Sequence, residues 1–546
     1  MKKNNSKNLL DKIDWITTLI PLIGIVFLTI LFIAFPQQST NTLDILRDFL
    51  GNQLGFYYML LGLGIFICSL YIAFSKYGDI VLGKTDKPKY SNFAWGAMVF
   101  TGTMAADILY WSMIEWAHYV NEPYVIDMGV QEWASTFPLF HWGPIPWGFY
   151  LILSAAFGFM LHVRGRNKQK FSEACRPLLG KRVDGLPGRL IDLTAVFALL
   201  AGTATTFSMA TPLLTEALNK IFGISTGMTT TIGILLIVAF VYTLTVLFGY
   251  EGISKASTLC AYLFFGLLGY FLIFGGEAVY IIETGISSIG NLVQNFIGMS
   301  TWMDPLRTSG EGGVGFAQNW TIFYWAYWMV WCVATPFFVG VISEGRTIRS
   351  TIMGGYLWGI AGTFTSFIVF GNFGLSQQMK GGLDVAGQLM AGASEAQIIV
   401  SIFEQLPFAS IGLLLLIITM ITFYSTTFDS LTMVISTYSY KRLEVTEETD
   451  KRVRVFWAIL FIIFPIGLLF SESSLNNLQS VSIIAAFPIG FVVLLIVGSF
   501  LKDAKSYLSE GKERATEEEF VESTSKVKEG TRKGVGGIRV QETYIK

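Results

Sequence analysis

Apolar residues fill most of the chain in long runs that are separated by shorter polar segments. A helix that spans a membrane needs roughly 20 predominantly apolar residues. Runs of this kind cover residues 15–35, 56–75, 94–119, 144–163, 190–213, 229–249, 257–275, 320–342, 352–372, 408–437, 454–471 and 479–501. The pattern therefore predicts an all-α integral membrane protein with twelve transmembrane helices.

Two of these runs depart from an ordinary spanning helix. Residues 94–119 contain the small and polar stretch "FTGTMAADI", and residues 320–342 are aromatic throughout and include Pro336. Each run opens a series of five. This order is expected of two inverted five-helix repeats whose first helices are broken near the middle of the membrane.

Charges in the loops indicate the orientation. The segment 163–189 has eight Lys or Arg residues against two acidic ones, whereas 120–133 has no Lys or Arg. Basic loops stay in the cytoplasm, so both termini are expected there, in the cell membrane. The expected divisions are a cytoplasmic N-terminus (1–14), two peripheral transmembrane helices (15–75), the first repeat (94–275), an extracellular loop with an amphipathic helix (276–319), the second repeat (320–501) and a cytoplasmic tail (502–546). The amphipathic helix either lies along the membrane surface or is an ordinary loop helix.

Composition narrows the class further. The chain is 52% hydrophobic and 14% charged, with a formal net charge of −1, which points to lipid as its surroundings and away from nucleic acid. Four cysteines and three histidines are scattered without the spacing of a disulfide framework or a metal site. An enzyme would also need a nucleophile with its base, and no such pair is evident. The sequence therefore favours a membrane protein that is not an enzyme and has no cofactor.

The stretch "GTMAADILYWSMIEW" places two carboxylates inside a spanning run. A charged group inside a bilayer costs several kcal/mol, so it needs a partner or a function. On a helix, Met104, Asp107, Trp111, Glu115 and His118 share one stripe. Either Asp107 and Glu115 face a wet cavity or they hydrogen-bond to neighbouring helices. For Asp107, which lies among small residues, the cavity is the favoured interpretation. For Glu115, which lies nearer the helix end, hydrogen bonding to a neighbouring helix is favoured.

Aromatic side chains accumulate in two other runs. In the eighth run, Trp328 and Trp331 lie in the middle, away from the membrane interface where belt residues sit; at the start of the fourth run the rings lie either at the outer mouth or, tilted by Pro144 and Pro146, further inward. The residues are Tyr324, Tyr327, Trp328 and Trp331 in the eighth run, and Trp142, Trp147 and Tyr150 in "FHWGPIPWGFY". Aromatic faces bind quaternary ammonium groups through cation–π contacts of roughly 2 kcal/mol each when desolvated. Converging rings and a buried carboxylate together predict a site for a small organic cation.

Oxygen donors suggest a second site. Thr426 and Thr427 lie beside Asp429 in the tenth run, and a helix break would free the backbone carbonyls near Thr101 and Met104. Oxygen ligands suit hard cations, so these residues are candidates for coupling to sodium. The alternative is that the two threonines hydrogen-bond adjacent helices.

At these residues the chain resembles the betaine/carnitine/choline transporter family over roughly residues 10–505. The strongest motif is "WTIFYWAYWMVWCVATPFFVGVISEGRTIR" (320–349), and "FHWGPIPW" and "SMIEW" are most similar to the carnitine branch. The resemblance implies a secondary transporter with the inverted-repeat fold also seen in neurotransmitter:sodium symporters. It also implies a homotrimer.

The resemblance also assigns residues. It places a central aromatic cage at Trp142, Trp147, Tyr150 and Trp328, with Trp331 one turn further inward. Tyr327 occupies a position where the family usually has a second Trp, and His118 one where the carnitine branch has a cage Tyr. Sodium-independent exchangers have an Arg in the seventh helix where this chain has Cys260, and the Thr426–Thr427 pair matches sodium-coupled members.

The third helix bears on the substrate. Betaine-specific members carry glycines where this chain has Thr103, Ala105 and Asp107, and choline-transporting members resemble it in having an Asp. Two like charges about 5 Å apart cost roughly 3 kcal/mol at an effective dielectric near 20, so Asp107 disfavours a substrate with its own carboxylate. An Asp at this depth also binds protons, which makes proton coupling an option.

These observations lead to two transport hypotheses and one of another class. The first is uptake of choline or a close relative by alternating access, driven by a proton or sodium gradient. The second is sodium-coupled uptake of glycine betaine or carnitine as an osmoprotectant. A cation receptor would keep the same cage without a path through the membrane, and accumulation in proteoliposomes separates it from a transporter.

Overall fold

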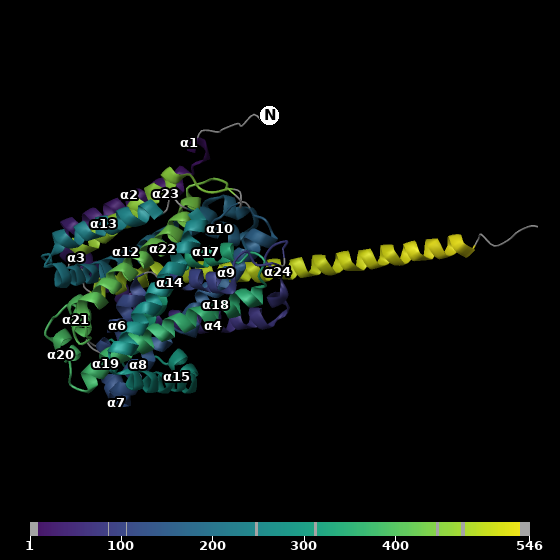
Figure 1. The fold of residues 1–546 in the computed structure, drawn as a ribbon. Coiled ribbons are helices and arrows are strands. Elements are labelled where there is room, and N and C mark those ends of the chain that lie inside the picture. The colour runs from purple at the N-terminus through teal and green to yellow at the C-terminus, as the bar shows by residue number, and fades with distance from the viewer. Residues whose placement is uncertain are drawn as a thin grey trace, which may run out of the picture.

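The computed structural model describes residues 9–534 except 86, 105, 167, 246–248, 311–313, 444–446 and 471–474. The described residues are almost entirely helical, and their β structure is limited to two isolated bridges, Ile13 with Tyr440 and Val81 with Thr347. The helices gather into one bundle from which the C-terminal helix extends (Figure 1). The predicted all-α class is confirmed.

The helices follow one another along the chain in three groups. The first group is α1 (Leu9–Lys12), α2 (Trp15–Ala34), α3 (Pro36–Arg47), the π-helix η1 (Asp48–Gln53), α4 (Gly55–Phe74) and the 3-10 helix η2 (Lys76–Asp79). The second group is α5 (Asn92–Thr101), α6 (Asp107–Tyr119), α7 (Pro123–Met128), α8 (Val130–His141), α9 (Pro144–Gly158), η3 (Phe159–Val163), α10 (Phe171–Ala174), α11 (Arg176–Leu179), η4 (Gly180–Asp184), α12 (Leu186–Phe222), α13 (Met228–Thr245) and α14 (Gly249–Phe274). The third group is α15 (Ala278–Thr301), η7 (Ala317–Thr321), α16 (Ile322–Trp331), α17 (Thr335–Ile342), α18 (Ile348–Ser366), η8 (Phe367–Gly371), α19 (Asn372–Met379), α20 (Val385–Met390), α21 (Glu395–Glu404), α22 (Ala409–Tyr438), α23 (Lys451–Phe470) and α24 (Leu475–Gly534).

The spans can be compared with the expected twelve. Among the described residues, nine helices are long and apolar enough to cross a membrane, and the bent pair formed by 317–331 and 335–342 makes a tenth. The two remaining runs, 94–119 and 229–249, correspond to the divided pair α5 and α6 and to the shorter helix α13. The chain is a multi-pass membrane protein, and the count of twelve stays a prediction.

Both expected helix breaks are present. Helix α5 ends at Thr101 and α6 begins at Asp107, after a stretch that starts with Gly102. A Cβ on Gly102 would lie 2.6 Å from the Met98 carbonyl oxygen, so a side chain there would not fit without a shift. Helices α16 and α17 meet at 52°. Pro336 stands in the first turn of α17, where its missing N–H costs nothing.

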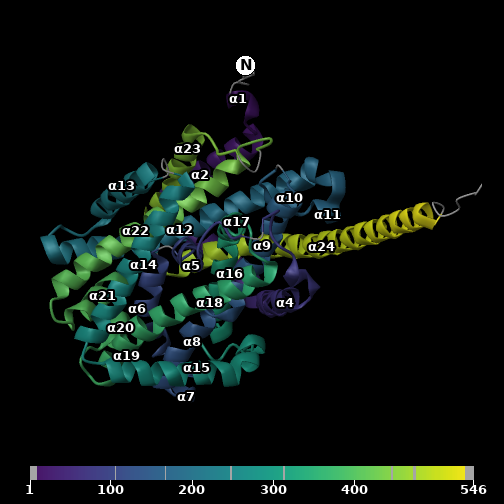
Figure 2. The ribbon, with the colours of Figure 1, turned by 45° about the vertical axis from the view of Figure 1, so that its right-hand side comes forward.

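Helix α15 has two different faces. Ile281, Ser288 and Leu292 are buried, whereas Ile286 and Val293 are 67% and 73% exposed. The buried face packs against α8, and Figure 2 shows α15 lying along the end of the bundle that is opposite α1. The amphipathic pattern of the sequence thus matches a helix that covers one end of the bundle.

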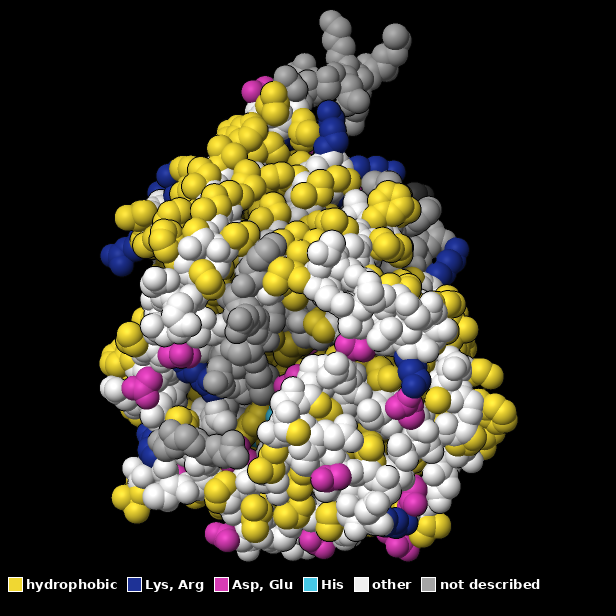
Figure 3. Space-filling view, turned by 90° about the vertical axis from the view of Figure 1, so that its left-hand side faces the viewer, with side chains coloured by type: hydrophobic (Ala, Val, Ile, Leu, Met, Phe, Trp, Pro, Cys, Tyr) yellow, Lys and Arg dark blue, Asp and Glu magenta, His cyan; other side chains and the backbone are white. Residues whose placement is uncertain are grey.

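The outer surface carries many apolar side chains. In the view of Figure 3, hydrophobic side chains cover much of the upper part, and the face is hollowed near its centre. Phe27, Leu60 and Phe240 are each more than half exposed. A surface of this kind suits contact with lipid acyl chains.

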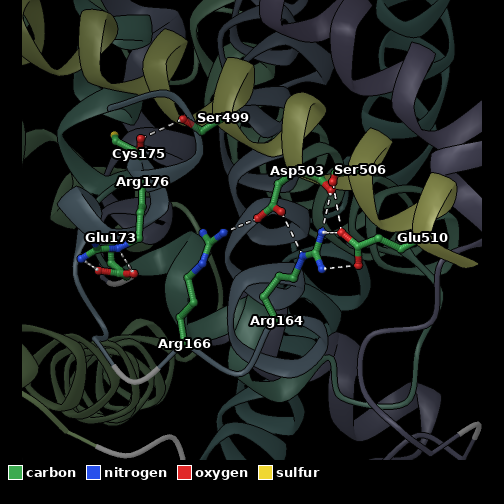
Figure 4. A network of polar contacts seen from close by, with 9 residues as sticks. All are labelled: Arg164, Arg166, Glu173, Cys175, Arg176, Ser499, Asp503, Ser506 and Glu510. Carbon is green, nitrogen blue, oxygen red and sulfur yellow. Dashed lines mark hydrogen bonds and ion pairs between the residues drawn. The ribbon is translucent and has the colours of Figure 1, made fainter. Parts of the chain in front are cut away.

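The C-terminal helix is held to a basic loop. Arg164 forms ion pairs with Asp503 at 2.9 Å and with Glu510 at 3.0 Å, and Arg166 also pairs with Asp503 (Figure 4). The hydrogen bonds and charges of Glu510 and Asp503 raise the pKa of Arg164. The basic loop therefore has acidic partners within the chain.

Candidate functional site

A small cavity lies beside the breaks in the two divided helices. It is lined by Thr103, Met104, Asp107, Trp142, Tyr150, Tyr327, Trp328 and Trp331. Its volume is about 10 Å³, which is room for about one water molecule. Most of the predicted substrate-binding residues thus lie around one cavity, and the space between them is only water-sized.

Trp328 of α16 is the centre of the aromatic cluster. Its ring centroid lies 4.8 Å from Tyr150, 5.3 Å from Trp147 and 5.5 Å from Trp142. The interplanar angles of 51° to 67° are tilted or edge-to-face arrangements, which aromatic pairs prefer over a face-to-face sandwich. Trp147 does not line the cavity but supports Trp328 from behind.

Asp107 is the carboxylate of this cavity and is only 4% exposed. Its Oδ2 atom accepts hydrogen bonds from Tyr327 and, at 2.7 Å, from Thr206 of α12. Its Oδ1 atom has no hydrogen-bond partner among the described residues. One carboxylate oxygen is therefore held by the protein, and the other is unpaired in a residue that lines the cavity.

Thr206 was not identified as a site residue from the sequence. It belongs to a run of hydroxyl residues, "TATTFS", in the middle of an otherwise apolar span. Its hydroxyl contacts both Asp107 and, at 2.9 Å, the Tyr327 hydroxyl. The hydroxyl run was the available signal, but nothing in the sequence showed that it faced Asp107.

His118 lies elsewhere. Its ring centroid is 5.2 Å from Trp320 and 6.4 Å from Trp111, and its Nε2 atom is 3.9 Å from the Glu395 carboxylate. It does not line the cavity. The structure therefore brings the other predicted cage residues together without His118.

The predicted cation-coupling residues also meet. The hydroxyls of Thr426 and Thr427 donate to the Thr101 carbonyl oxygen at 3.2 and 3.0 Å. Ser430 reaches the Gly102 carbonyl in the same way at 3.2 Å. These contacts join α22 to the end of α5, so the hydroxyl pair both links helices and gathers oxygen atoms. Such oxygen atoms fit a hard monovalent cation.

Met104 and Cys260 lie close to these two groups of residues. The Met104 side chain lines the small cavity. Thr422 of α22 donates to the Cys260 sulfur at 3.6 Å, which places Cys260 against the same helix as the hydroxyl pair.

Ala105 lies outside the described residues. Among the described residues no cluster of three or more His, Cys, Asp or Glu side chains is arranged to hold a metal ion.

A larger cavity of about 350 Å³ lies beyond the ends of α17 and α22. His162, Glu344, Thr437, Glu448 and Arg454 are among its lining residues. Helix α22 contributes to both regions, because it carries the Thr426–Thr427 pair and also Thr437. The hydroxyl pair and the larger cavity therefore lie along one helix.

Comparisons with known proteins agree with these features. A family model described as "BCCT, betaine/carnitine/choline family transporter" matches residues 16–508. The chain is 30% identical over 486 residues to the probable glycine betaine transporter of Desulfitobacterium hafniense (strain Y51), which covers 87% of this chain and 94% of that protein. It is 26% identical over 478 residues to the high-affinity choline transport protein of Escherichia coli (strain K12), with coverage of 87% and 69%.

Among solved structures, a Na⁺-coupled sialic acid symporter in a substrate-bound outward-open state matches 81% of this chain and 86% of its own, at 15% identity and a TM-score of 0.44. The relatives named above are transporters, which confirms that this chain is not an enzyme. Since the family model covers nearly the whole chain, the resemblance inferred from the motifs is confirmed, and the chain belongs to the betaine/carnitine/choline transporter family.

Proposed function

We propose that this protein takes up choline, or a close quaternary ammonium relative, by alternating access. The observation that carries the proposal is the free oxygen of Asp107, which lies in a cavity with Trp142, Tyr150 and Trp328. A cationic substrate would pair with this carboxylate, while its methyl groups would contact the ring faces. Choline has no carboxylate of its own, so nothing on it is repelled by Asp107.

Binding requires the cage to open. A trimethylammonium group is larger than the water-sized space in the cavity, so the rings must separate before it enters. Each ring face that contacts the cation contributes roughly 2 kcal/mol once water is excluded. The interruptions between Thr101 and Asp107 and between Trp331 and Thr335 are the natural hinges for this change, because a continuous helix ends there and a new one begins.

The driving ion is a proton or sodium, each with a candidate position. Sodium would be carried as a co-substrate between the Thr101 carbonyl and the hydroxyls of Thr426 and Thr427, which supply oxygen ligands. A proton would bind to the carboxylate of Asp107. In both cases the cation sits beside a hinge, so its binding favours one arrangement of the half-helices.

A second candidate function is sodium-coupled uptake of glycine betaine or carnitine as an osmoprotectant. Two observations favour it: the relative at 30% identity is named a probable glycine betaine transporter, and Thr426 and Thr427 gather oxygen atoms at α5. Under this function the substrate carboxylate would face Asp107, which would then have to be protonated.

The membrane arrangement follows from the loop charges. We place both termini in the cytoplasm, with the basic loop 163–189, and the 350 Å³ cavity on the release side. Release would then run along α22 from the cage toward Thr437. Membership in the family implies a homotrimer.

The test is uptake by the purified protein in proteoliposomes. Radiolabelled choline, glycine betaine and carnitine are offered with a sodium gradient or a pH gradient imposed separately. We expect choline to accumulate against its gradient under one of the two. Accumulation of betaine or carnitine alone would establish the second candidate, and binding without accumulation under any gradient would indicate a receptor.

A further inference from the structure

Glu115 is a second buried carboxylate, and its contacts are different from those of Asp107. Its side chain is fully buried and accepts hydrogen bonds from the Tyr119 hydroxyl at 2.7 Å and the Trp142 indole nitrogen at 2.8 Å. His141, also fully buried, has its Nδ1 atom 3.1 Å from the same carboxylate. Three polar groups therefore contact this one carboxylate.

The imidazole of His141 bridges two polar groups. Its Nδ1 atom lies beside Glu115 and 2.9 Å from the Tyr119 hydroxyl, and its Nε2 atom lies 3.0 Å from the Thr321 hydroxyl. With Nδ1 as a donor to Glu115, neutral His141 accepts at Nε2 from Thr321. If Nε2 is protonated, the same hydroxyl rotates and accepts instead, because a hydroxyl both donates and accepts. The pair therefore accommodates one extra proton without losing a hydrogen bond.

The charge of the pair depends on that proton. With neutral His141 the pair carries a net charge of −1, and with protonated His141 it carries none. The other titratable groups that face it are Tyr119 from α6 and Tyr324 from α16, which stacks on His141 at 4.9 Å; Glu122 also acts on Tyr119 electrostatically. Among the described residues that contact the pair there is no Lys or Arg, so the negative charge is not cancelled locally.

Trp142 connects this pair to the cage. Its indole N–H donates to Glu115, while its ring lines the cavity and meets Trp328 at 5.5 Å. An N–H that donates to an anion enriches the ring in electron density, since hydrogen-bonded groups polarise one another. A richer ring face attracts a cation more strongly. A carboxylate outside the cavity thus acts on a cation inside it.

We propose that Glu115 and His141 form a proton-binding site beside the cage, and that loss of its proton strengthens cation binding through Trp142. The proton site stands on the geometry of the pair alone. Its effect on affinity rests on the proposed function, because it requires a cationic substrate. Glu115 is accordingly a positioning residue that both orients Trp142 and sets the charge behind it.

The first experiment tests the proton site without any substrate. The chain has three histidines, so protein labelled with ¹³C and ¹⁵N at histidine gives three ring signals that His118→Gln and His162→Gln variants assign. We expect the His141 signal to move between about pH 6.5 and 4.5, below the range of an exposed histidine because the ring is fully buried, and this movement to be changed by Glu115→Gln. A His141 signal that is constant over this range in the unmodified protein would overturn the proposal, and so would identical movement in the variant.

The second experiment measures equilibrium binding of choline at low and high pH within this range. Affinity is expected to fall about three- to tenfold at the lower pH, with a smaller fall in Glu115→Gln and in Trp142→Phe, which keeps a ring but lacks the N–H. Glu122→Gln is the matched control, because Glu122 is a buried carboxylate that accepts from Trp320 at 2.6 Å outside the cavity. Equal pH dependence in all four proteins would refute the link to Trp142. Absence of choline binding at every pH would refute the proposed function and leave the histidine signals as the measure of the proton site.

Discussion

Replacing Asp107 with Asn tests the choice of substrate most directly. The amide keeps the shape of the side chain and still accepts from Thr206 and Tyr327 through its oxygen. It removes the charge that we assign to the substrate ammonium group. Because Asp107 is only 4% exposed, water does not screen this charge as it would at the surface.

The magnitude follows from the position of the carboxylate. A cation that fills the cavity would lie about 5 Å from the unpartnered Oδ1 atom, and at an effective dielectric near 20 the pair interacts by roughly 3 kcal/mol. Loss of this interaction weakens choline binding more than a hundredfold, since each 1.4 kcal/mol is about tenfold. Glycine betaine carries both charges, so the same replacement removes an attraction and a repulsion together and changes its binding much less than that of choline.

The assay is binding and uptake of choline and of glycine betaine by the same reconstituted variant, compared with the unmodified protein. Glu122→Gln serves as the control for loss of a buried carboxylate outside the cavity. Both variants must elute as the unmodified protein does on size exclusion. If Asp107→Asn leaves the ratio of choline to betaine affinity unchanged, Asp107 is not the counter-ion and the substrate argument fails.

Three further predictions concern other parts of the molecule. Trp328→Leu removes the ring that contacts the other aromatic residues of the cavity, so the Kd for choline should rise about thirtyfold. The control is Trp325→Leu, which lies outside the cavity lining. It should lower thermal stability and leave the Kd within about twofold. Thr427→Ala should raise the sodium concentration needed for half-maximal uptake, if sodium is the driving ion, and an unchanged sodium dependence would contradict this site. Arg164→Glu should release the C-terminal helix from the basic loop and speed its cleavage by trypsin, and adding Asp503→Arg in the same chain should restore protection. These partly exposed ion pairs contribute about 1 kcal/mol or less each. Uptake at low salt should therefore change little.

The fold was largely predictable because membrane burial imposes long apolar runs. The expected spans 15–35 and 56–75 match α2 (Trp15–Ala34) and α4 (Gly55–Phe74) within a residue. The expected span 190–213 became α12, Leu186–Phe222, because the helix continues with polar residues beyond the apolar run. Hydropathy locates the part of a helix that lies in hydrocarbon and not where its backbone hydrogen bonds end.

The site was predictable only in part because a helical stripe does not identify the neighbours of its residues. From Asp107 to Glu115 the helix advances by about 12 Å and turns by a net of about 80°. The two carboxylates therefore meet different elements. Asp107 contacts side chains of α12 and α16, and Glu115 contacts His141 at the end of α8 and Trp142 directly after it. His118, about three turns beyond Asp107 on the stripe, approaches Glu395 instead. The aromatic cluster was easier to foresee, since large rings in the middle of spans have few places other than a shared interior.

Under the proposed function, the broken helix explains why a carboxylate at position 107 favours a cationic substrate. Asp107 is the first residue of α6, and the start of a helix carries a partial positive charge from its unpaired N–H groups. In transporters with discontinuous helices such helix starts face the anionic group of the substrate. Here the side chain of Asp107 brings its own negative charge to that end, so the favourable interaction with the helix is already satisfied by the protein. We therefore expect the substrate group at this end to carry a positive charge, which the ring faces of Trp142 and Trp328 can accept without a hydrogen bond.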